Sequence, residues 1–330
     1  MAKKTGFVLL GKGVSQKHKN DHVIAIRGTA NTADALTDIS SHTTGSESGD
    51  TVHIGFQRSF ISFKPELENY LRKAKTNGET TIHCIGHSLG GALASLTADW
   101  IKSNPEFQGK VYLYTFGAPR VGLNGFATKT SNKVDKIFRC VHGADPVPKV
   151  PVWPFYHAPI NGAEYLLETS QGIRLSAHSM ESGPGYINTA NNQSWDNLHT
   201  QYTSSIKKRV ILNYEHRTHT TYSTAWADKI GAAILTLLID GGFSATVGIL
   251  QAGGASVGTT YDMMAKSVTN IAQMGPELKE RVKGLLGCML AYAGKGVNYA
   301  IKFTAQFIQW VFKITIDRIY AAARQALNQY

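Results

Sequence analysis

The sequence of 330 residues predicts an α/β fold with a C-terminal α-helical region. Short β-branched and apolar runs alternate with helix-like segments over roughly the first 190 residues, as in α/β proteins. A tight turn with the sequence GHSLG joins the strand-like residues 80–85 to the helix-like residues 91–100. Further on, glycine- and alanine-rich apolar stretches replace the strand patterns. We expect an α/β domain over residues 1–195 and a mainly helical region over residues 196–330, divided near the polar residues 189–194.

The chain begins with two predicted strands, residues 6–11 and 21–26. Residues 1–5 carry two lysines but no apolar core or cleavage site, so we expect no signal peptide. The odd number of cysteines argues against a disulfide framework and for a reducing compartment; they are Cys84, Cys140 and Cys288. We therefore expect a protein that is cytoplasmic in the producing cell, and that reaches any target membrane through a non-classical secretion system.

The GHSLG turn predicts a nucleophilic serine at Ser88. A strand that enters a helix through so tight a turn forces its middle residue into a strained backbone conformation, and it lifts the hydroxyl above the sheet edge. Gly86 and Gly90 are needed because a Cβ atom at either position would collide with the neighbouring strand or helix. The helix that follows Ser88 also directs unpaired N–H groups at the point where negative charge would develop.

A serine reacts only with a base and an orienting acid, which in such a fold follow it in the order Asp, His. Residues 138–148 are typical of a strand that ends in a proline-rich loop, and this places Asp145 at the same sheet edge as Ser88. The Asp145 carboxylate would accept the Nδ1 proton of the histidine and fix its tautomer. The alternative is that Asp145 only caps a turn before Pro146.

His178 is the candidate base among the twelve histidines. It follows residues 165–168 and 173–175, which we interpret as the two strands of a hairpin, and it lies in a loop that can fold back over Ser88. Histidines are more often surface or hydrogen-bonded core residues than bases, so alternatives stay open. These rivals are His142, His157 and His199.

Several ordered motifs resemble those of the class 3 lipase family, the fungal triacylglycerol-lipase-like branch of the α/β-hydrolase fold. The resemblance covers roughly the first 190 residues, and its motifs together are far more specific than any one of them. They are Arg27-Gly28-Thr29, residues 34–38 with Ala35 where tryptophan is usual, residues 52–56, 86–91, 115–122 and 143–148, and His178-Ser179-Met180 with Tyr186 beyond it.

The resemblance implies an α/β-hydrolase, to which the composition adds a C-terminal α-helical region, and it assigns the reacting groups. It makes Ser88 the nucleophile, Asp145 the orienting acid and His178 the general base. It also makes the backbone N–H groups of Thr29 and Leu89 the oxyanion hole, which would hold the negative charge of a tetrahedral intermediate.

Other positions are expected to be structural or to shape access. The family carries its lid where residues 30–39 lie, although this segment has few large apolar side chains. Arg27 and Asp38 are expected to form a structural ion pair, while His53 and His87 are expected to pack rather than react. No CxxC, HExxH or EF-hand pattern occurs, so we expect no metal and no cofactor.

The C-terminal region leaves two interpretations open. Residues 230–257 form an apolar stretch whose one charge is Asp240, and residues 284–319 mix large apolar side chains with lysines. The first interpretation is a set of helices that pack on the α/β domain or on a second copy. The second is a membrane-engaging module with a helical hairpin around Asp240, although neither half of that stretch reaches the roughly 20 apolar residues that a span requires.

The formal net charge of +11 favours an anionic partner. We expect a lipid substrate or a membrane surface rather than nucleic acid, because no nucleic-acid-binding motif accompanies the charge. The short start and helical tail also resemble bacterial type VI secretion effectors of the same family, which implies an immunity protein or a secretion-machine component as a further partner.

These observations predict a serine esterase that hydrolyses acyl esters of glycerolipids through an acyl-Ser88 intermediate. Phospholipid is the favoured substrate, in a phospholipase A type of reaction, and an antibacterial effector role is a further expectation. The alternatives within the class are a triacylglycerol lipase or another carboxylesterase. An alternative of another class is a membrane-disrupting protein that acts through its C-terminal helices.

Overall fold

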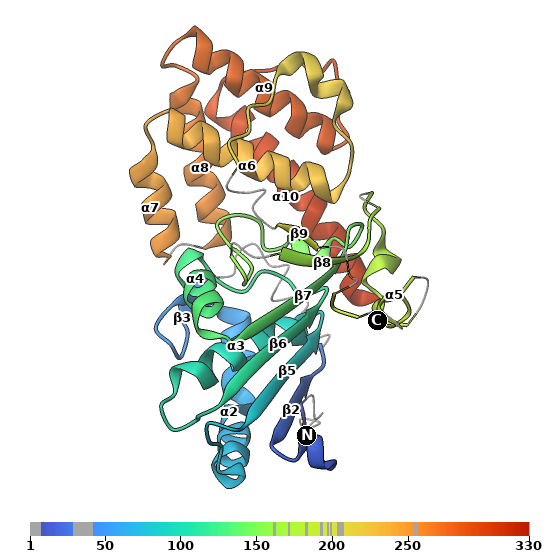
Figure 1. Cartoon of the computed structure of the whole chain (residues 1–330). Coiled ribbons are helices and arrows are strands. Elements are labelled where there is room, and N and C mark those ends of the chain that lie inside the picture. The colour runs from blue at the N-terminus through green and yellow to red at the C-terminus, as the bar shows by residue number, and fades with distance from the viewer. Residues whose placement is uncertain are drawn as a thin grey trace, which may run out of the picture.

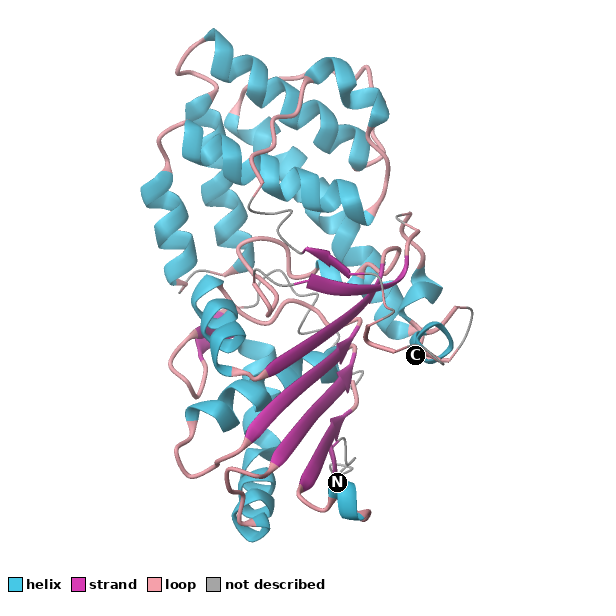
Figure 2. Ribbon diagram, in the orientation of Figure 1, coloured by secondary structure: helices cyan, strands magenta, loops and turns pink. Residues whose placement is uncertain are grey.

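A seven-stranded mixed β-sheet forms the centre of one half of the molecule, and a group of helices forms the other half (Figures 1 and 2). The computed structural model describes residues 8–28, 42–160, 163–170, 172–181, 184–191, 194–196, 198, 200–202, 208–253 and 256–329. The sheet has the order β1-β2-β5-β6-β7-β8-β9. Its strands are β1 Val8–Lys12, β2 Asp21–Ile26, β5 Thr81–His87, β6 Lys110–Phe116, β7 Lys136–His142, β8 Ala163–Glu168 and β9 Thr200–Tyr202.

The five inner strands are parallel, and both edge strands are antiparallel to their neighbours. Because parallel strands share a direction, the carboxyl ends of β5 and β7 meet at one edge of the sheet. Ser88 directly follows β5, and Asp145 lies three residues after the end of β7. The topology alone therefore brings these two side chains to the same edge, and the predicted α/β fold and its first two strands are confirmed.

Three helices cover the sheet: α2 Ile54–Ala74, α3 Leu89–Ser103 and α4 Asn124–Lys133. Helix α3 is buried over nearly its whole length, which explains its alanine, glycine and leucine content. Helix α2 buries one face at intervals of three or four residues, through Phe56, Phe60, Phe63, Leu67 and Leu71. Next to them, β3 Thr43–Gly45 and β4 Thr51–His53 form a separate two-stranded sheet.

The second half of the molecule contains α6 Thr224–Asp240, α7 Ser244–Ala252, α8 Val257–Ile271, α9 Pro276–Tyr292 and α10 Ala305–Asn328. Their apolar faces belong to the same continuous cluster of buried side chains as the sheet and its helices. Helix α10, drawn in red in Figure 1, runs from this group down to the sheet side of the molecule. The first apolar stretch, residues 230–257, contains most of α6, all of α7 and the first residue of α8, with Gly241 and Gly242 in the turn between α6 and α7. The second, residues 284–319, contains parts of α9 and α10 and the non-helical residues 293–304 between them.

In the described part of the chain, none of the helices combines enough length with enough apolar character to cross a lipid bilayer.

The predicted hairpin over residues 165–175 is wrong. Strand β8 pairs in parallel with β7 and antiparallel with β9, so its partners are distant in sequence. Residues 173–175 are not a strand, because the Arg174 N–H bonds the Ala144 carbonyl and the chain then enters a 3-10 helix, η3 Leu175–His178. Strand β9 belongs to the sheet although it lies beyond residue 195, so the predicted boundary cuts off one strand.

Candidate active site

The turn after β5 holds Ser88 in a backbone conformation that side chains rarely adopt. Its φ is 58° and its ψ is −133°. This conformation costs free energy, and the close packing of the neighbouring glycines maintains it. A Cβ atom on Gly86 would lie 2.1 Å from the Gly90 carbonyl oxygen, and one on Gly90 would lie 2.1 Å from the Ile26 carbonyl oxygen. The expectation that these two positions must be glycine is confirmed.

A hydrogen-bonded chain of three buried side chains begins at Ser88. The Ser88 Oγ atom lies 2.7 Å from His178 Nε2, and His178 Nδ1 lies 2.8 Å from Asp145 Oδ2. The side chains of Asp145 and His178 are 0% and 1% exposed. An ionised carboxylate only accepts hydrogen bonds, so Nδ1 carries a proton and donates it to Asp145, and Nε2 is left to accept the Ser88 hydroxyl proton.

The Asp145 carboxylate is stabilised in its ionised form. Burial opposes its ionisation, but the electrostatic interaction with the His178 imidazole and three hydrogen bonds outweigh burial and hold the pKa of Asp145 below its usual value. The donors are His178, the Val147 N–H at 2.9 Å and the Tyr186 hydroxyl at 2.8 Å. Asp145 does accept a turn hydrogen bond from Val147, as its alternative interpretation expected, and it orients His178 as well.

Tyr186 supports this carboxylate from a fully buried position at the start of α5 Tyr186–Ala190. Its hydroxyl donates to Asp145 and accepts the backbone N–H of His142 at 3.1 Å. Its ring stacks on that of His142, with centroids 3.9 Å apart and planes within 2° of parallel. Burial raises the pKa of Tyr186 well above its usual value, so the hydroxyl keeps the proton that it donates. The sequence motif contained Tyr186, but no local pattern indicated its contact with Asp145.

The other histidines near the site are bound in structural contacts. His87 bonds the His178 carbonyl oxygen at 2.8 Å, and burial together with the electrostatic interaction with the His178 imidazole lowers the pKa of His87 to about 4. His142 contacts the Ala177 carbonyl and the Thr189 hydroxyl, and His157 contacts the Pro148 carbonyl. His53 caps α2 by accepting the Gly55 N–H. The rival base His199 lies outside the described residues.

One half of the expected oxyanion hole lies in the described structure. Leu89 is the first residue of α3, so its N–H has no partner within the helix. Gly28 comes close to this group, since a Cβ atom on it would lie 3.5 Å from Leu89 N. The other expected donor, Thr29, lies outside the described residues. The same is true of the expected lid over residues 30–39 and of Asp38, the expected partner of Arg27.

The described part of the chain contains no group of three or more His, Cys, Asp or Glu residues that could hold a metal ion. The three cysteines are buried thiols. Burial raises the pKa of Cys140 to about 12, and it raises the pKa of Cys84 and Cys288 as well. These thiols therefore stay protonated and act as core side chains.

Comparison with known proteins matches residues 23–155, which include Ser88 and Asp145, to the family described as lipase (class 3). The chain is 31% identical over 137 residues to secreted mono- and diacylglycerol lipase 1 of Fusarium solani, covering 40% of each chain. It is 30% identical over 157 residues to the chloroplastic phospholipase A(1) DAD1 of Arabidopsis thaliana, covering 42% of this chain and 35% of that protein.

Among solved structures, the triacylglyceride lipase of Rhizomucor miehei aligns with 28% identity and a TM-score of 0.40, over 48% of this chain and 61% of that one. The chain spans about 35–55% of the length of the first curated relatives that it matches. The match to the family begins within β2, contains the strained serine turn and ends just beyond the Asp145 loop. Over these residues, the chain is similar to the class 3 lipases.

Proposed function

We propose that this protein is a carboxylic ester hydrolase that cleaves acyl esters of glycerolipids through an acyl-Ser88 intermediate. The observation that carries the proposal is the continuous chain of hydrogen bonds from Ser88 through His178 to Asp145. The match of residues 23–155 to the class 3 lipase family, and relatives named as acylglycerol lipases and phospholipases, support the same class of reaction.

In the first half of the reaction, Ser88 Oγ attacks the carbonyl carbon of the ester while His178 Nε2 takes the hydroxyl proton. The imidazolium that forms is stabilised by the Asp145 carboxylate, which Tyr186 and the Val147 N–H hold in place. The Leu89 N–H is suited to donate to the new oxyanion, and the loss of one such donor typically costs about 10²–10³-fold in rate. His178 then returns its proton to the leaving alcohol, and the acyl group stays on Ser88.

In the second half, water takes the place of the alcohol. His178 accepts a proton from water, and the hydroxide equivalent attacks the acyl-Ser88 carbonyl. The intermediate collapses, the C–O bond to Ser88 breaks, and the Ser88 oxygen recovers its proton from His178. The products are a fatty acid and the free enzyme, and the step consumes one water molecule.

Within this class we propose phospholipid as the substrate. The net charge of +11 favours association with an anionic lipid surface, which concentrates the enzyme on its substrate. Three of the relatives are named phospholipases A1, although others are named mono- and diacylglycerol lipases. A triacylglycerol lipase is therefore the outcome that the experiment has to distinguish.

The test compares fatty-acid release from anionic phospholipid vesicles with release from a triacylglycerol emulsion. The wild type is run beside Ser88→Ala and beside Ser95→Ala, a matched control that removes another buried serine hydroxyl of the same segment. We expect release from vesicles by the wild type and by Ser95→Ala, and none by Ser88→Ala.

Each other result has a definite meaning. Release from the emulsion alone would replace the phospholipid proposal with a triacylglycerol lipase. Release that persists in Ser88→Ala would contradict the acyl-Ser88 mechanism. Leakage of a trapped dye in Ser88→Ala without fatty-acid release would favour a membrane-disrupting protein. A folded wild type that releases no fatty acid from either lipid would overturn the proposed substrate class.

A further inference from the structure

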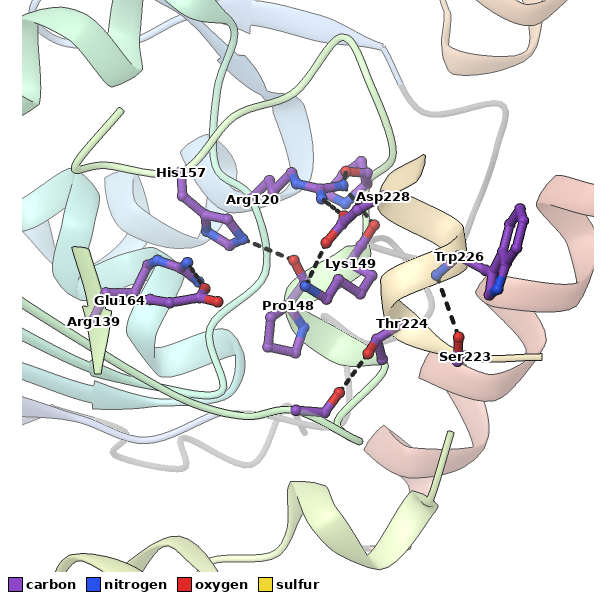
Figure 3. Close-up of polar contacts among 12 residues, drawn as sticks. Arg120, Arg139, Pro148, Lys149, His157, Glu164, Ser223, Thr224, Trp226 and Asp228 are labelled. Carbon is purple, nitrogen blue, oxygen red and sulfur yellow. Dashed lines mark hydrogen bonds and ion pairs between the residues drawn. The ribbon is translucent and has the colours of Figure 1, made fainter. Parts of the chain in front are cut away.

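A largely buried ion cluster joins the helical half of the molecule to the segment that carries Asp145 (Figure 3). Asp228 on α6 bonds Lys149 Nζ at 2.8 Å through one carboxylate oxygen and Arg120 Nη2 at 3.0 Å through the other. The three side chains are 16%, 17% and 5% exposed. Lys149 lies four residues after Asp145, in residues 143–150, which we call the acid loop.

Arg120 fastens the far end of the acid loop to the sheet side of the molecule. Its Nη1 atom donates to the Lys149 carbonyl at 2.7 Å and to the Pro151 carbonyl at 3.1 Å, and its backbone N–H donates to the Val150 carbonyl at 2.9 Å. The guanidinium can hold this fork only if its charge is balanced, because an unpaired buried charge is strongly unfavourable. Among the contacts described for Arg120, the balancing carboxylate comes from Asp228 on α6.

Asp228 is suited to this role electrostatically. Burial opposes its ionisation, but the charges of Lys149 and Arg120 outweigh burial and lower the pKa of Asp228. Arg139, which forms its own buried pair with Glu164, adds to the same effect. The carboxylate is therefore ionised at neutral pH and neutralises the cluster.

The same helix also holds the near end of the acid loop. The Thr224 hydroxyl, in the first turn of α6, donates to the Gly143 carbonyl. Gly143 and Lys149 flank Asp145 in the sequence, so α6 contacts the loop before and after the carboxylate.

The helical half also reaches the segment that carries His178. Helix α10 packs against η3, whose last residue is His178, and against η2 Val147–Lys149, which is part of the acid loop. The partners on both sides of the His178–Asp145 hydrogen bond therefore rest on helices that lie outside the family match of residues 23–155.

We propose that Asp228 is a positioning residue: through Arg120 and Lys149 it holds the acid loop where Asp145 bonds His178. The inference rests on the proposed function, because it assigns the helical half a part in the same reaction. A displacement of about 1 Å in a reacting group can cost about 10²-fold in rate. The loss of Asp228 therefore lowers the rate of the chemical step more than it lowers substrate binding.

The central variant is Asp228→Asn, with Asp240→Asn as its matched control. Both aspartates lie on α6, and their side chains are similarly exposed, at 16% for Asp228 and 13% for Asp240. Each also binds two cationic side chains, which for Asp240 are Arg209 and Arg281. The acid loop supplies neither cation of Asp240. The two variants therefore remove the same charge from the same helix, but only Asp228→Asn removes a charge that contacts the acid loop.

Two readouts separate positioning from general stability. The first is kcat and KM on a soluble p-nitrophenyl ester, for which we expect a loss of about tenfold or more in kcat with little change in KM for Asp228→Asn. The second is amide hydrogen exchange in the acid loop, which we expect to rise in Asp228→Asn. The acid-loop amides to follow are those that donate hydrogen bonds, which are the N–H groups of Gly143, Asp145, Val147, Lys149 and Val150. For Asp240→Asn we expect kcat within twofold of the wild type and unchanged exchange in the loop.

A milder pair serves if Asp228→Asn does not fold. Thr224→Val removes the hydroxyl that bonds Gly143. Thr236→Val removes a buried hydroxyl of α6 that donates to the Ala232 carbonyl and accepts the Val210 N–H, away from the acid loop. We expect a lower kcat and faster loop exchange in the first variant only. Asp228→Glu keeps the charge and should retain kcat within about threefold of the wild type.

The proposal is overturned if folded Asp228→Asn keeps the kcat and loop exchange of the wild type, or if Asp240→Asn loses as much of both. It is also overturned if Thr224→Val and Thr236→Val behave alike. Failure of the proposed function can be told apart from failure of this inference. If the wild type shows no Ser88-dependent ester cleavage, amide exchange in the acid loop can still be compared between the wild type and Asp228→Asn.

Discussion

Close packing at single backbone atoms fixes the conformation of Ser88. Gly90 faces the Ile26 carbonyl so closely that Gly90→Ala would place a Cβ atom 2.1 Å from that oxygen. We expect this substitution to reduce the free energy of unfolding by about 3 kcal/mol or to prevent folding, because backbone on both sides has to move. Chemical denaturation measures the effect.

Gly231→Ala is the control for this prediction. Gly231 lies inside α6, and a Cβ atom on it would meet nothing within 4 Å. Alanine is the better helix former, so this variant should gain about 0.5–1 kcal/mol. Equal effects of the two substitutions would contradict the assignment of close packing at Gly90.

Tyr186 should matter through its one oxygen atom. Tyr186→Phe removes a donor from Asp145 and leaves the His142 N–H without its acceptor, so we expect about a tenfold lower kcat and a loss of about 1–2 kcal/mol in stability. Tyr292→Phe is the matched control, because the buried Tyr292 hydroxyl makes no hydrogen bond to the described residues. An unchanged kcat in Tyr186→Phe would show that Asp145 does not depend on this donor.

The base can be identified with two histidine substitutions. We expect His178→Ala to lower kcat by roughly 10⁴-fold or more, because the proton acceptor for Ser88 is lost. We expect His199→Ala to retain most of the activity. Steady-state rates with a soluble ester decide between them, and the reverse pattern would replace His178 as the base while leaving the reaction class intact.

At the scale of the element, α2 ends at an unusual residue. Its C-cap Lys75 has φ 51° and ψ 55°, a left-handed conformation that glycine adopts without steric cost. We expect Lys75→Gly to raise the free energy of unfolding by about 0.5–1 kcal/mol, because relief of the strain exceeds the added entropy of the unfolded chain. Lys73→Gly, inside the last turn of the helix, should destabilise by about 1 kcal/mol. Thermal unfolding of both variants tests the sign.

The elements that the sequence predicts well are those stabilised by local patterns. Residues 21–26 alternate between buried and partly exposed positions, and the GHSLG turn carries its own glycines, so both are visible in the sequence. Strand β8 was misjudged because its partners lie in β7 and β9 rather than in the next apolar run. The apolar pattern of a segment can indicate a strand, but it does not identify the distant strand with which that segment pairs.

The candidate site was predictable to the same extent. Ser88, Asp145 and His178 follow from motif order, whereas the support that Tyr186 gives to Asp145 depends on how α5 packs. Asp228 was missed because a single acidic residue at the start of an apolar helix resembles an ordinary surface charge. Only the fold places it beside Arg120, which is 108 positions away in the sequence.

At the scale of the whole molecule, buried histidines make stability depend on pH. Burial lowers the pKa of His22, His83, His142 and His157, and it lowers the pKa of His87 to about 4 from its ordinary 6.5. Below about pH 6.5 the unfolded chain binds protons that the folded chain excludes, so stability falls as the pH falls. For His87 this loss continues to about pH 4 and amounts to about 3 kcal/mol.

We therefore expect the free energy of unfolding in urea to decrease steadily between pH 7 and pH 4.5. His87→Gln, which cannot be protonated, should flatten part of this dependence. The carboxylates with lowered pKa values, Asp145 and Asp228, act in the same direction at lower pH, and the variant separates their share from that of His87. A free energy that is independent of pH over this range would contradict the burial of these imidazoles in the neutral form.

The contact between Arg120 and Asp228 also has a consequence for the order of events during protein synthesis. The ribosome completes the serine turn, Arg120 and the Asp145 segment before it reaches Asp228, which follows Arg120 by 108 residues. At about 5–20 residues per second, this interval is roughly 5–20 s. Once Asp145 and Lys149 have been added, the nascent chain contains Ser88 and Asp145 but still lacks the carboxylate that neutralises Arg120 and Lys149. Neutralisation of this cluster is thereby delayed until α6 has left the ribosome.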